Sequence, residues 1–221
     1  VASRGLGDVY KRQAYNYDVM RSAGEGRPWL LMEQAPSAVN WRQHNTPKSR
    51  GRNRLMSWQA VAQGADSVVY FQWRASRGGA EKYHSAMVPH GGADTRIFRE
   101  VCEVGEELAG LGEIAGTTVA ADVALLMDWS SWWALELDSH PSAQLRQEEA
   151  NLAHYAPLFD AGVTCDVVPP TRDLSPYKLV VVPALYMLDE RHAAGLTAYV
   201  RDGGHLVVSF FSGIVDSLSL I

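Results

Sequence analysis

The residue of this chain best placed to do chemistry is Glu33. It follows the apolar residues 29–32 and precedes a polar stretch, so a short buried strand would deliver a carboxylate into a loop. A strand buried on both faces is a continuous apolar run, and in a β/α barrel the catalytic groups lie where such strands end. The alternative is a solvated loop residue, which is the usual place of a glutamate.

The elements that would position Glu33 are two strands joined by a helix. After a polar loop, residues 55–63 carry apolar side chains at helical spacing, and Gly64 fits the end of that helix. Residues 68–73 are typical of the next strand. Two parallel strands connected through a helix form a right-handed crossover, which is the repeating unit of a β/α barrel.

The second half of the chain predicts another α/β unit. It is preceded by an amphipathic helix near residues 97–111, which Asp94 or Thr95 is able to cap. Strands and helices then alternate in the manner of a doubly wound open sheet. The expected strands are 122–127, 163–168, 179–182 and 205–210, and the expected helices are 144–161 and 190–201.

The composition of the chain limits the classes of function that it can have. The 221 residues are 47% hydrophobic and 20% charged, which is typical of a globular chain of one or two domains. A net charge of -5 argues against nucleic-acid and membrane-surface partners, because excess Lys and Arg hold such partners. A local group of basic residues is best explained as a solvated loop: Arg42, Lys48, Arg50, Arg52 and Arg54. No apolar stretch has the length of a membrane span or the form of a secretory signal, so a cytoplasmic location is expected.

The two cysteines, Cys102 and Cys165, have no metal-ligand spacing and suit a reducing compartment. We expect both to lie in the core. Cys165 falls inside an expected strand and not on a glycine-flanked turn between strand and helix, so an activated thiol is not expected there.

Three segments resemble one enzyme family. Residues 32–41 (MEQAPSAVNW) resemble the nucleophile segment of the glycoside hydrolase family 42 β-galactosidases. Residues 69–77 (VYFQWRASR) and 80–90 (AEKYHSAMVPH) resemble the last barrel strand of that family and its loop, in the same order. The similarity extends over residues 14–216.

The resemblance implies the fold class α/β. Residues 14–115 would be the C-terminal part of a (β/α)8 TIM barrel, and residues 116–216 a doubly wound, glutamine-amidotransferase-like domain. In the family that domain lacks amidotransferase chemistry and builds a homotrimer. Residues 1–13 and 217–221 match nothing in the family and look like translated linker or adaptor sequence, so we expect an internal slice of a longer protein.

The resemblance also implies retaining hydrolysis of terminal, non-reducing β-D-galactose residues, with Glu33 as the nucleophile. A second carboxylic acid, about 5–5.5 Å away, protonates the leaving oxygen in such a reaction. In this family that acid is a glutamate preceded by an asparagine, and no Asn-Glu pair occurs in this chain. The chain alone is therefore expected to be inactive. The chemistry needs no cofactor, and no metal is predicted for this chain.

For substrate binding, the resemblance implies that Glu81 and His84 hold hydroxyl groups of galactose and that the ring of Trp41 forms part of the sugar site. Alternatives remain open from the residues themselves. Trp41 would then pack the loop against the barrel rim, Glu81 would form a surface ion pair near Lys82, and His84 would cap a turn.

Two other functions remain open at this stage. The chain itself would be a non-catalytic remnant that oligomerises and contacts sugar, or its parent would be a retaining hydrolase of another glycoside, such as an arabinoside or a fucoside.

Overall fold

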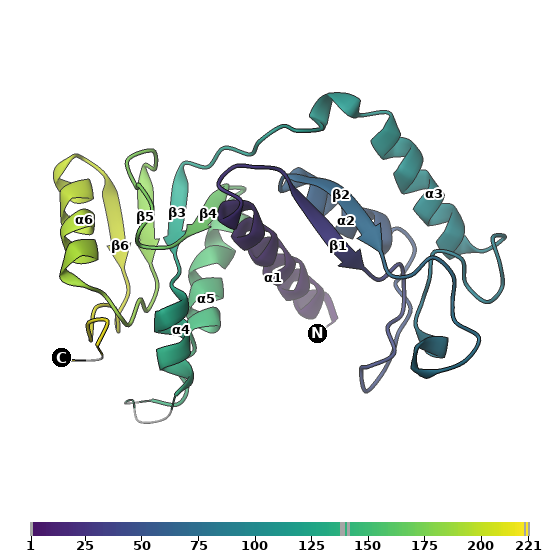
Figure 1. The fold of residues 1–221 in the computed structure, drawn as a ribbon, viewed down its shortest axis with the longest axis horizontal. Helices are drawn as coiled ribbons and strands as arrows, with labels where there is room; N and C mark the ends of the chain where they lie inside the picture. Colours follow the sequence, from purple (N-terminus) through teal and green to yellow (C-terminus); the bar gives the residue numbers. More distant parts are fainter. Residues whose placement is uncertain (1, 138–139, 141, 219, 221) are drawn as a thin grey trace. The chain divides into compact units, whose positions relative to one another are not determined.

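The computed structural model describes residues 2–137, 140, 142–218 and 220 of the chain. They form two compact units (Figure 1). One unit is Gly26–Val119, and the other combines Val1–Glu25 with Ala120–Ile221.

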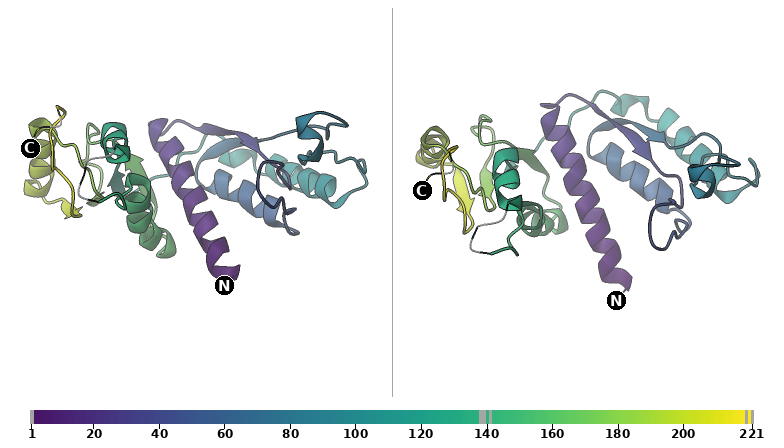
Figure 2. Two further views of the ribbon diagram at one scale, coloured as in Figure 1. Left: turned by 90° about the horizontal axis from the view of Figure 1, so that it is seen from below. Right: turned by 60° about the horizontal axis from the view of Figure 1, so that its bottom comes forward.

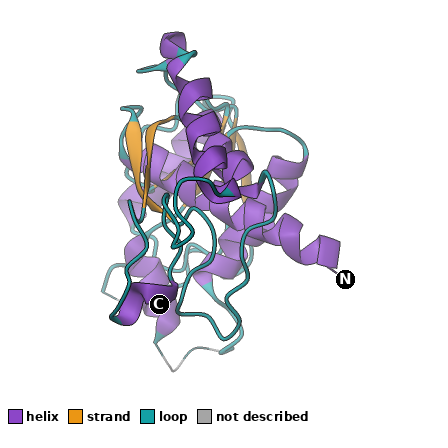
Figure 3. Cartoon of the chain, turned by 90° about the vertical axis from the view of Figure 1, so that its right-hand side faces the viewer, coloured by secondary structure: helices purple, strands orange, loops and turns teal. Residues whose placement is uncertain are grey.

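The unit Gly26–Val119 contains the expected strand-helix-strand crossover. Strand β1 (Trp29–Gln34) leads through a long loop to helix α2 (Arg52–Ala62), and strand β2 (Ala65–Tyr70) then pairs with β1 in parallel (Figure 1). Gly64 makes the turn between α2 and β2 with φ +92°, a backbone conformation that glycine adopts without strain. Long loops, teal in Figure 3, follow both strands.

Strand β2 begins and ends three residues earlier than the expected strand 68–73. The early start reflects the pairing of Ala65 with Trp29, and the early end reflects a change of partner. The Phe71 backbone N–H still donates to the Gln34 carbonyl, but the carbonyls of Gln72 and Trp73 accept hydrogen bonds from Met87 and Val88. The chain thus leaves β1 after Phe71 and pairs with the loop that follows, which bears a short 3-10 helix, η1 (Ala80–Tyr83).

Helix α3 (Arg96–Ala109) has the expected amphipathic pattern and buries Val101 and Val104. The expected cap is wrong, because neither candidate side chain caps the helix. Thr95 is the N-cap residue by position, but its hydroxyl donates to the Gly92 carbonyl, and Asp94 pairs with Arg99 at 2.5 Å. A second 3-10 helix, η2 (Gly112–Ile114), follows α3.

The other unit is built on a parallel sheet with strand order β4-β3-β5-β6. The strands are β3 (Val123–Leu126), β4 (Cys165–Val168), β5 (Leu179–Val182) and β6 (His205–Val208). The helices are α1 (Ala2–Ala23), α4 (Trp129–Glu136), α5 (Gln147–Asp160) and α6 (Glu190–Arg201). Strands β5 and β6 extend the sheet on one side of β3 and β4 on the other, as in the doubly wound pattern that the sequence predicts.

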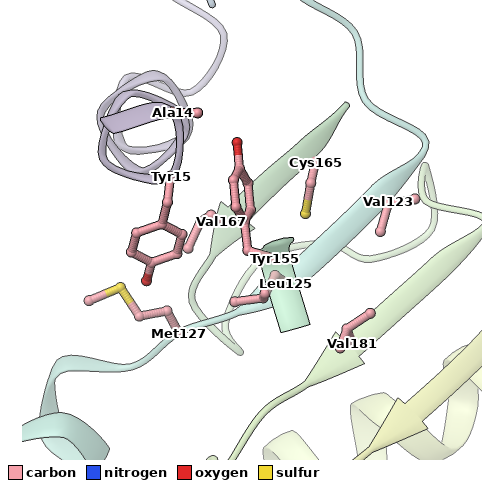
Figure 4. Packing of buried hydrophobic residues seen from close by; sticks show 9 residues of the cluster. All are labelled: Ala14, Tyr15, Val123, Leu125, Met127, Tyr155, Cys165, Val167 and Val181. Atoms are coloured by element: carbon pink, nitrogen blue, oxygen red, sulfur yellow. The ribbon is translucent and has the colours of Figure 1, made fainter. Parts of the chain in front are cut away.

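Each face of this sheet has its own apolar core. Alternate strand residues face opposite sides, so neighbours along β3 contribute to different clusters. One cluster lies under α1 and α5 (Figure 4): Ala14, Tyr15, Val123, Leu125, Met127, Tyr155, Cys165, Val167 and Val181. The other includes residues of α6: Ala124, Leu126, Val168, Leu174, Val180, Val182, Leu185, Leu196 and Tyr199. Figure 2 shows the helices around this sheet from two further directions.

Helix α1 is tied to this unit by buried polar contacts. The Arg21 guanidinium, 5% exposed, pairs with Asp18 at 2.8 Å and with Asp166 of β4 at 2.6 Å. The Tyr155 hydroxyl of α5 donates to the other oxygen of Asp18. Residues 14–25, which the sequence grouped with the barrel segment, thus pack with residues 120–221. The expected domain bounds and the two expected tails stay predictions.

None of the helices within the described ranges has the length and apolar character needed to cross a membrane.

Candidate active site

Glu33 lies one residue before the end of β1 and is exposed. The pairing of β1 with β2 is irregular here, because Leu31 is opposite Val68 and Gln34 is opposite Tyr70. From one pair to the next, β1 advances by three residues and β2 by two, so β1 has one extra residue, as in a β-bulge. A bulge changes the face to which the following side chains point, and such bulges are frequent beside active sites. Gln34 is buried as a result, while Glu33 projects into solvent.

The loop after β1 is joined to the loop after β2 by two hydrogen bonds. The Ser37 N–H donates to the Ser85 hydroxyl at 2.9 Å, and the Ser85 N–H donates to the Ala38 carbonyl at 2.9 Å. These two bonds hold the segment that carries Glu33 and Trp41 beside the segment that carries Glu81 and His84.

Glu81 is half-buried and accepts a hydrogen bond from Asn40. The Asn40 side-chain amide donates to Glu81 Oε2 at 3.2 Å and to the Ala80 carbonyl at 2.7 Å. No ion pair between Glu81 and Lys82 occurs among the described residues; Lys82 instead donates to the Gly79 carbonyl and lies over the ring of Tyr83. Asn40 thus orients the Glu81 carboxylate. Sequence reasoning missed it, although it directly precedes Trp41.

His84 is 2% exposed and lies between two aromatic rings. The Trp41 ring stacks on it with centroids 5.1 Å apart, and the Phe71 ring meets it edge-on at 4.9 Å. His84 Nδ1 lies 2.7 Å from the Ser85 carbonyl, a contact that requires the proton on Nδ1. Nε2 is buried and has no hydrogen-bond partner in the part of the chain that is described. Trp41 itself is 63% exposed.

A buried polar network lies behind Glu33, and sequence reasoning missed it as well. Gln34 Nε2 donates to Ser57 Oγ at 2.8 Å and to Asn53 Oδ1 at 3.3 Å, and Ser57 Oγ lies 2.7 Å from the Tyr70 hydroxyl. The available signal is the spacing of Asn53 and Ser57, four residues apart on α2, which places two polar side chains on one face of that helix. Burial raises the pKa of the Tyr70 hydroxyl.

Lys48 also reaches this network from the loop between β1 and α2. Its ammonium donates to the Ala35 carbonyl at 2.5 Å and to Asn53 Oδ1 at 3.2 Å. Burial, with the nearby charge of Arg52 as a second cause, lowers the pKa of Lys48 to about 8. Lys48 is therefore not simply a solvated basic residue, as the sequence predicts, because its ammonium group is partly buried and hydrogen-bonded.

These residues suit a carbohydrate site. One carboxylate is exposed at a strand end, a second is oriented by an amide, and an aromatic face is available to the apolar side of a sugar ring. No group of three or more His, Cys, Asp or Glu side chains able to hold a metal ion occurs within the described ranges. Exposed carboxylates at strand ends are the groups that do the chemistry in barrel glycoside hydrolases.

Comparison with known proteins agrees with this class. The family model described as "Beta-galactosidase" matches residues 5–111, and the one described as "Beta-galactosidase trimerisation domain" matches residues 121–221. The β-galactosidase BgaB of Geobacillus sp. strain Y412MC61 is 48% identical over 200 residues, which are 90% of this chain and 30% of that protein. GanA of Bacillus subtilis strain 168 is 41% identical over 215 residues, or 96% of this chain and 32% of that protein.

Solved structures give the same result. Gan42B, a GH42 β-galactosidase from G. stearothermophilus, superimposes with a TM-score of 0.93 at 40% identity, covering 97% of this chain and 31% of its own. The β-galactosidase of Bacillus circulans sp. alkalophilus gives 0.93 at 41% identity, covering 96% and 32%.

The chain belongs to the glycoside hydrolase family 42 β-galactosidases. It spans about 30% of the length of the curated relatives it matches. The predicted family and fold class, the C-terminal part of a TIM barrel followed by a doubly wound domain, are confirmed.

One sequence expectation is wrong: Cys102 is exposed, because it lies on α3 beside Val101 but outside the face that this helix buries. Cys165 is buried as expected, and burial raises the pKa of its thiol to about 12.

Proposed function

We propose that the protein to which this chain belongs hydrolyses terminal β-D-galactosides with retention, and that Glu33 is its nucleophile. The observation that carries the proposal is the position of Glu33 at the carboxyl end of a barrel strand, next to a loop cluster of Trp41, Glu81 and His84, in a member of a β-galactosidase family.

In the proposed mechanism the Glu33 carboxylate attacks the anomeric carbon while a second carboxylic acid protonates the departing oxygen. Water then hydrolyses the glycosyl ester, and the second residue now acts as the base. The chain has no Asn-Glu pair to supply that acid. We therefore propose that the 221 residues alone turn over galactosides negligibly.

We assign sugar binding to the loop cluster. The Glu81 carboxylate accepts a sugar hydroxyl, and Asn40 keeps it oriented at 3.2 Å. His84 Nε2 forms a hydrogen bond with a second hydroxyl, which requires the exposed ring of Trp41 to shift from its position over the imidazole. Sites that pair with specific hydroxyls discriminate strongly, because the wrong sugar leaves buried polar groups unpaired. The match to β-galactosidases is what favours galactose over the arabinoside and fucoside alternatives.

The test is hydrolysis of nitrophenyl glycosides by the longer protein that contains this chain. Glu33→Gln keeps the size of the side chain but removes the charge, so kcat should fall on the order of 1000-fold or more, as when a covalent nucleophile is lost. Glu113→Gln, at an exposed glutamate of η2, is the matched control and should leave kcat unchanged. Activity that survives Glu33→Gln, or a preference for another sugar over galactose, would refute the corresponding part of the proposal.

We further propose that the longer protein is a homotrimer. Residues 121–221 match a trimerisation domain, and this unit exposes large apolar side chains, among them Trp129 (52%), Trp133 (67%) and Phe210 (77%), of the kind that subunit interfaces bury. Sedimentation equilibrium should give three times the mass of the polypeptide. A monomer at every concentration would exclude the trimer.

The cytoplasm is our proposed location, because Cys102 and Cys165 are both unpaired thiols. Recovery of the protein outside the cells on fractionation would contradict it.

A further inference from the structure

We infer that Lys48 is a positioning residue for Glu33: its ammonium group fixes the backbone just after the carboxylate by holding the Ala35 carbonyl against α2. The inference rests on the proposed function for its catalytic consequence, but the ordering of the backbone is a property of the chain itself.

The strand pairing holds this backbone on one side only of Ala35: the Gln34 carbonyl still accepts a hydrogen bond from the Phe71 N–H, and the ladder ends there. The β-bulge between Leu31 and Gln34 interrupts the ladder with β2 at the position of Glu33. An unpaired residue in a bulge has lost the ladder hydrogen bonds that normally hold a strand. Other contacts must therefore fix where Glu33 points.

The two residues that follow Glu33, Gln34 and Ala35, are both held through hydrogen bonds that involve Asn53 Oδ1. The Gln34 side-chain amide donates to Asn53 Oδ1 at 3.3 Å, and the Lys48 ammonium donates to the same oxygen at 3.2 Å while it also binds the Ala35 carbonyl at 2.5 Å. Asn53 is 1% exposed, and it lies in the first turns of α2. Residues 34 and 35 are thus both held to the same point on a helix.

The backbone of Lys48 is itself held by hydrogen bonds. Its backbone N–H donates to the Ser37 hydroxyl at 3.2 Å, and its carbonyl accepts a hydrogen bond from the Arg96 guanidinium at 3.0 Å. Arg96 is paired with Glu100 at 2.8 Å. The Lys48 backbone is therefore fixed between two elements, namely helix α3 and the loop that follows β1. This fixed backbone limits the positions that the ammonium group can reach.

The bond from Lys48 to Ala35 depends on charge. A charge-assisted hydrogen bond is about twice as strong as a neutral one. Among the described residues, Arg52 of α2 acts electrostatically on the Lys48 ammonium, and Arg96 of α3, which is paired with Glu100, binds the Lys48 carbonyl. Because burial lowers the pKa of Lys48 to about 8, the ammonium is present at neutral pH and is lost as the pH rises through that value.

The first experiment is hydrogen exchange on the 221-residue chain, with Lys48→Met, Lys48→Arg and, as matched control, Arg50→Met at an exposed position of the same loop. Lys48→Met should speed amide exchange in residues 33–38 at least several-fold, and the other two variants should leave it near wild type. Urea midpoints distinguish local loosening from loss of the fold. Equal exchange in Lys48→Met and wild type would overturn the inference whatever the activity.

The second experiment uses the longer protein and nitrophenyl galactoside. Lys48→Met should lower kcat on the order of 10- to 100-fold with KM within about twofold, because a misplaced reacting group slows the chemical step more than it weakens binding. Lys48→Arg should restore most of kcat and move the alkaline limb of the pH profile upward. An unchanged kcat in Lys48→Met would refute the positioning role. If the wild-type protein were inactive on galactosides, only the proposed function would fail, and exchange would still decide the ordering role.

Discussion

Removal of the Arg21 guanidinium should cost the unit that contains the four-stranded sheet a large part of its stability. Arg21 and Asp18 are each 5% exposed, and the guanidinium also binds Asp166 at 2.6 Å and the Cys165 carbonyl at 2.9 Å. Arg21→Met preserves the apolar stem but leaves the two carboxylates without their cation. Breaking a buried pair from one side typically costs about 3–5 kcal/mol, out of a total stability of about 5–15 kcal/mol.

Urea unfolding followed by hydrogen exchange measures this change and assigns it to one unit. With an m-value of about 1.5 kcal/mol per molar urea, a loss of about 3–5 kcal/mol lowers the midpoint by about 2–3 M. Peptides from α1 and β4 should lose protection, whereas those from β1 and β2 should not.

The control is Lys178→Met, which removes a surface pair with Asp122 whose side chains are 75% and 64% exposed. Such pairs contribute about 0–1 kcal/mol, so its midpoint should stay within about 0.7 M of wild type. If Arg21→Met were no more destabilising than this control, the view that the buried network holds α1 in place would be refuted.

Further predictions concern the cysteines and two glycines. At pH 8 iodoacetamide should modify the exposed Cys102 and leave Cys165 intact, as read by peptide mass. Folding raises the pKa of the Cys165 thiol from 9.0 to about 12, so the protonated thiol is favoured in the folded state. The free energy of unfolding measured in urea should therefore fall as the pH rises from about 9 to 12. Gly204→Ala should destabilise by about 1–3 kcal/mol in urea unfolding, because a Cβ would lie 2.2 Å from the Tyr199 ring. Gly195→Ala, in open space on α6, should stabilise by about 0.5–1 kcal/mol, and a loss there would contradict the reasoning.

The sequence predicts elements best where one interaction decides them. The expected strand 179–182 and helix 190–201 coincide with β5 and α6, because an uninterrupted apolar run and a regular helical pattern each permit one arrangement. Helix α4 was missed since WSSWWALE has no clear apolar face; the signal present was Asp128, whose carboxylate accepts from the Ser131 N–H at 2.7 Å as an N-cap. Helix α1 is not among the predicted elements: residues 2–13 fall in the expected tail, and the remaining part up to Ala23 carries no predicted element.

For the candidate site, the strand end that bears Glu33 follows from local sequence, whereas its environment does not. The bulge depends on the register with β2, and the Asn40 contact with Glu81 joins residues 41 positions apart. The sequence places Lys48 in solvent, because clustered basic residues usually form a solvated surface. The ammonium group of Lys48 reaches the Ala35 carbonyl only because the loop between β1 and α2 folds back on itself, and this folding cannot be read from local sequence.

If Glu33 attacks the sugar, a covalent glycosyl ester on its carboxylate can be trapped and identified. The longer protein would be treated with a 2-deoxy-2-fluoro-β-galactoside carrying a good leaving group, which slows breakdown of the glycosyl-enzyme, and its peptides analysed by mass spectrometry. The proposal predicts one added fluorogalactosyl group on Glu33 and none in Glu33→Gln. A label on any other carboxylate, with Glu33 unmodified, would contradict it.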